Sequence, residues 1–177
     1  GLAKGPAAAA ISATLVGAAH AQTTEVNFGI ISTESSQNLK TIWNPFLAAM
    51  EKETGLKINA FFATDYAGVI EGMRFDKVQI AWFGNKSAME AVDRSDGEIF
   101  AQTVDAEGNP GYWSLLPANV DSPINTLEDA ITCDASLTFG IADPHSTSGS
   151  RVPTTSLFAN HRSAPTTHFH PDVTRHH

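Results

Sequence analysis

The amino-acid sequence predicts an α/β fold in which parallel strands alternate with helices. Short apolar runs, typical of buried strands, alternate with amphipathic stretches whose apolar residues recur at helical spacing. Capping residues and glycines stand at several boundaries between the two kinds of segment. The spacing suits right-handed βαβ units, and no internal repeat is visible.

The first βα unit is expected between residues 25 and 55. EVNFGII (25–31) has the composition of a buried strand. The following helix would have one apolar face, formed by Leu39, Ile42, Trp43, Phe46, Leu47 and Met50. Pro45 either kinks this helix or begins it with Asn44 as the cap, and Gly55 is expected to end it.

Two similar units follow. KINAFFA (57–63) is expected to be a strand, and Asp65 to cap the next helix. VQIAWFG (78–84) predicts a third strand. Ser87 and Glu90 then have the spacing of a capping box, for a helix that extends through Val92.

The pattern changes after the third unit. EIFAQTV (98–104) predicts a fourth strand, and the residues up to Val120 an extended hinge strand after a Gly-Pro turn. Thr126 and Asp129 then predict a capped short helix through Ile131, followed by the strand SLTFGI (136–141). We expect a first α/β lobe at residues 22–120 and the beginning of a second at residues 121–177. So short a second lobe is expected to be incomplete, and the region beyond Pro153 to be poorly ordered.

The first 21 residues have the layout of a secretory signal peptide. A basic residue, Lys4, precedes an apolar run from residue 7 to residue 19, and Ala19-His20-Ala21 is a small-x-small cleavage pattern. The alternative is a disordered alanine-rich leader. We expect cleavage after Ala21, a periplasmic location and no direct insertion in the membrane afterwards, because no later stretch has the length of a membrane span.

Composition and absent motifs argue against several function classes. The net charge of −8 disfavours nucleic acid and anionic membrane surfaces as partners. The single Cys133 cannot form an intrachain disulfide, and no P-loop or G-x-S-x-G elbow is present. We therefore expect neither an enzyme nor a bound cofactor.

One motif suggests a binding function. In ADPHSTSGSRVP (142–153), Ser146, Thr147 and Ser148 lie where a strand should give way to a helix. A single hydroxyl would suffice as an N-cap. Three hydroxyls beside the free N–H groups of a helix start also describe an anion site, and both interpretations remain open at this point.

Several long blocks, in the right order, resemble the phosphonate-binding periplasmic proteins of ABC transporters. They are NFGIISTESSQNLKTIWNPFLAAMEKETG, INAFFATDYAGVIEGMRFDKVQIAWFGNKSAMEAVDR, FAQTV, GYWS and LTFGIADPHSTSG. The resemblance covers residues 27–153. It implies a periplasmic-binding-protein type II-like fold, with two α/β lobes that close on a ligand, and a complete protein much longer than this chain, whose second lobe would be incomplete here.

The resemblance also implies a set of ligand-binding residues. Ser146, Thr147 and Ser148 would hold the phosphonate oxygens, and Tyr66 would reach them from the first lobe. Phe83, where relatives can have Tyr, would line the pocket without a hydroxyl. His177, or His176 if the spacing differs by one, falls at the place of a pocket histidine. The implied partners are an alkyl- or aminoalkylphosphonate and an inner-membrane ABC permease.

Three alternatives to a phosphonate receptor stay open. The hydroxyl cluster could serve another tetrahedral oxyanion, such as phosphate or phosphite. His168 and His170, together with the final His-His pair, could bind Zn²⁺ and make the protein a metal-binding protein or an enzyme. Finally, the chain as it stands could be too short to bind a ligand.

Overall fold

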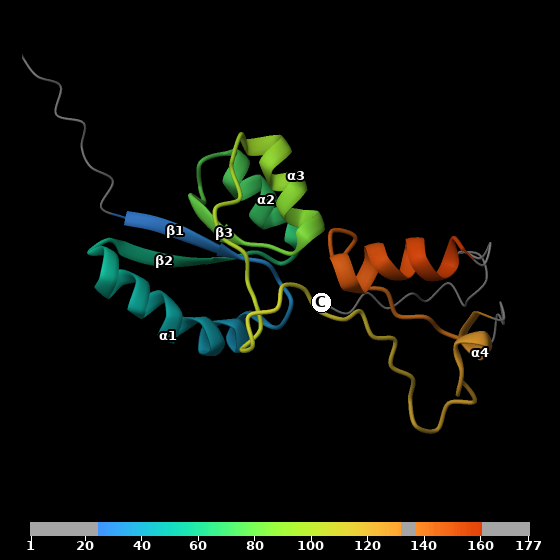
Figure 1. The fold of residues 1–177 in the computed structure, drawn as a ribbon. Coiled ribbons are helices and arrows are strands. Elements are labelled where there is room, and N and C mark those ends of the chain that lie inside the picture. Colours follow the sequence, from blue (N-terminus) through green and yellow to red (C-terminus); the bar gives the residue numbers. More distant parts are fainter. Residues whose placement is uncertain (1–24, 132–136, 161–177) are drawn as a thin grey trace, which may run out of the picture.

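The structure is a computed structural model that describes residues 25–131 and 137–160. A three-stranded sheet with helices on both faces forms one part of the molecule, which we call the sheet lobe (residues 25–95) (Figure 1). Residues 121–131 and 137–160, which we call the distal segment, lie beyond the carboxyl ends of the strands (Figure 1). The predicted α/β class is confirmed.

The sheet consists of three parallel strands in the order β2-β1-β3. They are β1 (Glu25–Ile30), β2 (Lys57–Phe62) and β3 (Ile80–Trp82). β1 pairs with β2 along its whole length and with β3 from Phe28 to Ile30. β1 is therefore the central strand, which explains why four of its six residues are buried.

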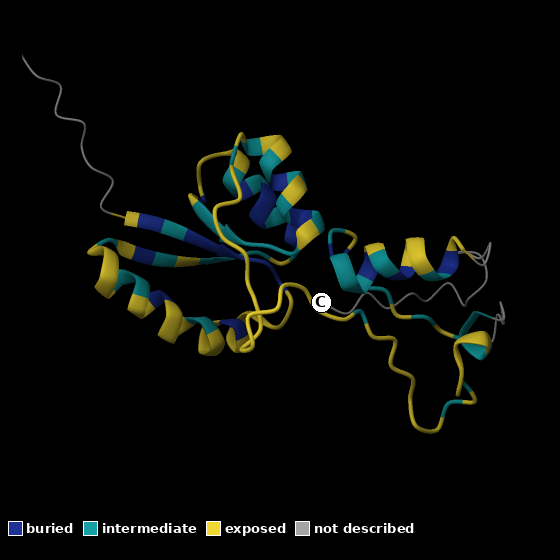
Figure 2. Cartoon of the chain, viewed as in Figure 1, coloured by how far each residue is buried: buried dark blue, intermediate teal, exposed yellow. Residues whose placement is uncertain are grey.

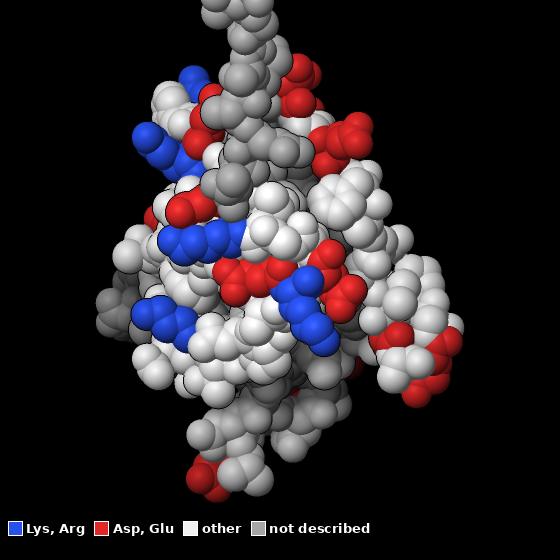
Figure 3. All heavy atoms as spheres, turned by 90° about the vertical axis from the view of Figure 1, so that its left-hand side faces the viewer, with Lys and Arg blue, Asp and Glu red and all other residues white. Residues whose placement is uncertain are grey.

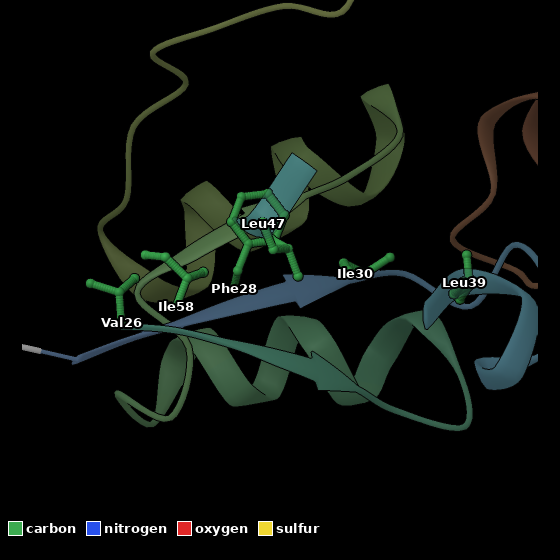
Figure 4. Close-up of a cluster of buried hydrophobic side chains, with 6 residues drawn as sticks. All are labelled: Val26, Phe28, Ile30, Leu39, Leu47 and Ile58. Atoms are coloured by element: carbon green, nitrogen blue, oxygen red, sulfur yellow. The ribbon is translucent and has the colours of Figure 1, made fainter. Parts of the chain in front are cut away.

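Helix α1 (Ser36–Thr54) covers one face of the sheet. Its Leu39 and Leu47 join the buried side chains of β1 and β2 in one apolar cluster (Figure 4). Ser35 caps the helix, and Gly55 ends it with a φ of 68° that suits glycine. The helix begins well before Pro45, so the alternative in which Pro45 starts it is wrong; packing of the apolar face outweighs the hydrogen bond that proline removes.

Helices α2 (Tyr66–Arg74) and α3 (Asn85–Ser95) cover the opposite face (Figure 1). Val69 and Ile70 of α2 are almost completely buried there. Gly29 of β1 allows this close approach, because a Cβ atom at residue 29 would lie 2.6 Å from Cγ1 of Val69.

Residues 98–120 contradict one prediction. The expected strand at 98–104 does not form, and Val104 only makes an isolated bridge with Pro110. A strand needs a neighbouring edge to satisfy its backbone, and within the described residues this segment has none. Its apolar side chains lie largely in solvent (Figure 2).

We expect this exposed apolar segment to bind the dye 1-anilinonaphthalene-8-sulfonate. Phe100, Trp113 and Leu115 are 72%, 87% and 80% exposed, and exposed apolar side chains bind the dye. Replacing these three residues together by serine should remove most of the dye fluorescence. Met89→Ser, at a single exposed site on α3, is the control. Undiminished fluorescence in the triple variant would contradict this assignment.

Each of the two described parts of the distal segment, residues 121–131 and 137–160, contains helix. Thr126 and Asp129 form the predicted capping box, because each backbone N–H donates to the other's side chain, and α4 (Leu127–Ile131) follows. The strand predicted at 136–141 is absent over its described residues, 137–141, which form no ladder. The strand lacks a partner edge, as residues 98–104 do.

Two π-helical stretches, η1 (Thr147–Arg151) and η2 (Pro153–Phe158), end the described chain. Phe158 is only 1% exposed and packs edge-on against Phe139, with ring centroids 4.7 Å apart. The expectation of poor order directly after Pro153 is therefore wrong up to residue 160, because this aromatic pair anchors the helix. Over the described ranges no helix is long and apolar enough to cross a membrane.

Candidate functional site

The candidate site lies at the carboxyl ends of the strands, where the distal segment meets the sheet lobe (Figure 1). The chain leaves β1 for α1 on one face and reaches β3 through α2 on the other. Such a reversal of strand order leaves a crevice beside the central strand, which is where open α/β sheets bind ligands. The amino ends of α2 and α3 both open toward this edge.

The amino end of α2 receives a carboxylate from the distal segment. Asp65 caps the helix as predicted, by accepting the N–H of Gly68 at 2.8 Å. The next free donor, the N–H of Tyr66, binds Oδ2 of Asp143 at 3.1 Å. A residue 77 positions away thus satisfies the helix start, where a negative group is stabilised by the helix dipole.

The amino end of α3 is capped in the same manner, by a hydroxyl of the distal segment. Gly84 is the N-cap residue and has no side chain to offer. Oγ1 of Thr147 accepts the N–H of Lys86 at 3.0 Å, and the Lys86 ammonium binds the carbonyl of Pro144. Ser87 accepts the N–H of Gly84. The predicted Ser87–Glu90 box is wrong, because Ser87 is the third residue of the helix and not its cap.

The three predicted hydroxyls have different surroundings. Ser146 is buried, caps η1 by accepting the N–H of Gly149 at 3.1 Å, and shares a hydrogen bond with the Tyr66 hydroxyl. Thr147 caps α3, as described above. Ser148 is half-buried, and its carbonyl accepts the hydroxyl of Ser114 at 2.7 Å. The structure therefore brings Tyr66, Ser146 and Thr147 together, and the cap interpretation of Ser146 is confirmed.

Tyr66 is held as a hydrogen-bond donor. Burial raises the pKa of its hydroxyl, and the nearby Asp143 and Tyr112 raise it further, while the bond with Ser146 acts in the opposite direction. The phenol stays protonated at neutral pH and can donate to an anion. Sequence reasoning did not single out Tyr112 or Asp143. The hydrogen bond from the Tyr66 N–H identifies Asp143, and Tyr112 enters only through its electrostatic effect on Tyr66.

Asp143 connects the distal loop to the sheet lobe. Its carboxylate is 7% exposed and accepts N–H groups from His145, at 2.8 Å, and from Tyr66. Burial is the largest single influence and raises the pKa of Asp143. The hydrogen bonds from His145 and Tyr66 together outweigh it, so the pKa lies below its usual value of 3.8.

The lowered pKa of Asp143 predicts an acid-sensitive contact. A carboxyl group with a folded pKa below its unfolded one stabilises the fold above the unfolded value, and this contribution disappears as pH falls through the folded pKa. The unfolding midpoint in urea should therefore fall more steeply below about pH 4 in the wild type than in Asp143→Asn. Asp93→Asn, at an exposed carboxylate on α3, is the control and should keep the wild-type acid profile. Identical acid profiles for the wild type and Asp143→Asn would contradict this assignment.

Of the other predicted site residues, the structure describes some and not others. Phe83 packs against the buried cluster of Ile31, Tyr66 and Val69, which fits a wall of the site. His177, His168 and His170 lie outside the described residues. Among the residues that are described, no group of three His, Cys, Asp or Glu side chains could hold a metal ion.

Comparison with known proteins identifies the family. The profile of the family described as "ABC transporter, phosphonate, periplasmic substrate-binding protein" matches residues 28–177. The chain belongs to this family. The predicted resemblance is confirmed, and with it the periplasmic-binding-protein type of fold.

Two curated proteins are similar in sequence to this chain. The Escherichia coli phosphonates-binding periplasmic protein is 63% identical over 148 residues, which are 82% of this chain and 44% of that protein. A phosphate-import protein of Mycolicibacterium smegmatis is 36% identical over 75% of this chain and 41% of its own length. The chain thus spans less than half the length of these two relatives.

Solved structures of phosphonate-binding proteins have the same fold. The crystal structure of a binding protein component of an ABC phosphonate transporter from Pseudomonas aeruginosa has a TM-score of 0.80 and 63% identity, over 83% of this chain and 49% of that one. A Prochlorococcus marinus protein in complex with methylphosphonate has a TM-score of 0.65 at 18% identity, over 83% and 53% of the two chains. The second likeness concerns the fold alone.

Proposed function

We propose that the chain is part of the solute receptor of a phosphonate ABC transporter, in which an alkyl- or aminoalkylphosphonate is captured between two lobes. The arrangement that supports this most directly is the clustering of the hydroxyls of Tyr66, Ser146 and Thr147 beside the amino ends of α2 and α3, at the carboxyl ends of the strands. A hydroxyl that accepts one hydrogen bond can still donate its own proton, so these three groups can bind an oxyanion without carrying a net charge.

Local donors must provide the affinity, because the overall charge of −8 repels an anion. Figure 3 looks onto the amino ends of the strands, the side opposite the candidate site, and both acidic and basic side chains lie on that side. Arg151, the cation next to the hydroxyl cluster in sequence, is exposed. Each hydrogen bond to a charged acceptor contributes about 1.5–3 kcal/mol, and micromolar affinity needs about 8 kcal/mol. Three or four such bonds in a closed site would suffice.

The proposed ligand set combines both parts of the molecule. Tyr66 and Phe83 contribute from the sheet lobe, and Ser146, Thr147 and Ser148 from the distal loop; His177 stays a prediction. No group in this set suggests covalent chemistry, so we propose reversible capture and delivery to a membrane permease. Residues 1–21 would direct the protein to the periplasm as a signal peptide.

The second candidate function is reception of inorganic phosphate. The name of the Mycolicibacterium smegmatis relative refers to phosphate import, and donors of this kind do not by themselves distinguish tetrahedral oxyanions. The discriminating feature would be the aromatic wall of Phe83 and Tyr66, which suits a carbon substituent better than a fourth oxygen.

Isothermal titration with methylphosphonate, 2-aminoethylphosphonate and phosphate tests the proposal. Two proteins are compared: the 177-residue chain and a chimera in which residues 25–160 replace the matching part of the Escherichia coli relative. We expect the chimera to bind a phosphonate with a Kd of about 1 μM or lower, and at least about tenfold more tightly than phosphate. A preference for phosphate would favour the second candidate. Binding of neither ligand by the chimera would reject both.

A further inference from the structure

His145 lies between two carboxylates from different parts of the molecule. Its Nδ1 is 3.1 Å from Oδ1 of Asp143, in its own loop, and its Nε2 is 3.3 Å from Oε2 of Glu90, on α3. The side chain is 24% exposed, so water screens these contacts only in part. The imidazole therefore bridges the distal loop and the sheet lobe.

Such a bridge depends on protonation. A neutral imidazole has one N–H donor and one acceptor lone pair, so it can bind one of the two carboxylates while its lone pair faces the other. An imidazolium ion donates to both. Two carboxylates on opposite nitrogens are thus both satisfied only by the charged form, and histidine changes charge within the physiological pH range.

The surrounding charges hold Glu90 in place for this contact. Arg94 binds Glu90 at 2.7 Å and also binds Glu71 of α2 at 2.7 Å. From the same helix, the Lys86 ammonium is directed to the carbonyl of Pro144. The Tyr66 N–H approaches Asp143 from α2. Together, these contacts fix the distance between α3 and the loop that His145 spans.

We propose that His145 is a positioning residue that, when protonated, clamps the loop bearing Ser146, Thr147 and Ser148 onto α3. The clamp keeps Thr147 on the N–H of Lys86 and Asp143 on the N–H of Tyr66. Its relevance to ligand capture rests on the proposed function, but the clamp itself needs no ligand. The contact is complete only while the imidazole carries both protons, because the neutral ring can donate to one carboxylate alone.

Amide hydrogen exchange of the ¹⁵N-labelled 177-residue chain, measured by NMR without ligand, tests this proposal. The N–H groups of Tyr66 and Lys86 report the clamp directly, because both donate to the distal loop. The Leu39 amide, bonded to Ser35 within the sheet lobe, is the internal reference. In the wild type we expect the protection factors of Tyr66 and Lys86, corrected for intrinsic exchange, to fall about two- to fivefold between pH 5.5 and pH 8. Protection of Leu39 should stay constant.

Three variants separate the clamp from a general structural effect. His145→Gln and Glu90→Gln should each lower the protection at pH 5.5 and abolish its pH dependence. Glu25→Gln removes an ion pair with Lys57 at the beginning of β1, outside the clamp, and should keep the wild-type profile. A wild-type pH profile in His145→Gln, or an equal loss at both pH values with the slope unchanged, would overturn the proposal. Failure to bind phosphonate would leave these exchange results untouched.

Discussion

Replacing Thr147 by valine is expected to weaken phosphonate binding by about 10- to 100-fold in the chimera. Valine has nearly the same shape but no hydroxyl, so a hydrogen bond to a charged oxygen is lost and the crevice keeps its volume. Isothermal titration with methylphosphonate measures the effect. Thr147→Ser, which keeps the hydroxyl, should bind within about threefold of the wild type and serves as the matched control.

The same substitution should also destabilise α3. The N–H of Lys86 would lose its acceptor, Oγ1 of Thr147, and loss of an N-cap acceptor costs about 1 kcal/mol. Urea unfolding of the ligand-free chain would report this loss. If Thr147→Val bound methylphosphonate as tightly as Thr147→Ser does, the hydroxyl would be excluded from the ligand set, whatever its effect on stability.

Replacing Ile30 by alanine is expected to lower the free energy of unfolding by about 2–5 kcal/mol. Ile30 ends the central strand β1, is 0% exposed, and belongs to the cluster with Leu39 and Leu47 (Figure 4). Truncation there removes buried apolar surface and leaves a cavity directly below the carboxyl edge that carries the site. Urea unfolding monitored by circular dichroism measures the change.

Ile42→Ala is the matched control for this prediction. Ile42 lies on α1 but is 62% exposed, so the same truncation should change the free energy of unfolding by no more than about 0.5 kcal/mol. Equal effects of the two substitutions would show that the cluster around β1 is not the stabilising core of the sheet lobe.

Elements whose capping hydrogen bonds are made by residues nearby in the chain were predictable from the sequence. The strand at 25–30, the end of α1 at Gly55 and the helix that follows Asp65 appear where the apolar spacing and the glycine and capping residues place them, whereas the Ser35 cap of α1 was not predicted. The reciprocal bonds of Thr126 and Asp129 also form as expected. In each case the hydrogen-bond partners lie within a few residues of one another, so a short stretch contains all the information that is needed.

Two predicted strands do not form in the structure. Residues 98–104 and 137–141 have apolar composition suited to strands, but a strand satisfies its backbone through a neighbour that its own sequence does not specify. Within the described part of the chain neither finds one. The predicted cap at Ser87 failed for a related reason, since the acceptor that serves α3 comes from Thr147, 61 residues beyond Lys86.

The sequence alone determined the alternation of strands and helices, the helix starts with local caps, and the identity of the hydroxyl cluster, because periodicity and capping act over one or two turns of chain. Only the tertiary structure decided which hydrogen-bond donors and acceptors come into contact. It placed Asp143 on the start of α2, Thr147 on the start of α3, and His145 between Asp143 and Glu90. These are contacts between residues far apart in the chain, and they exist only because the sheet order β2-β1-β3 brings both helix starts to one edge.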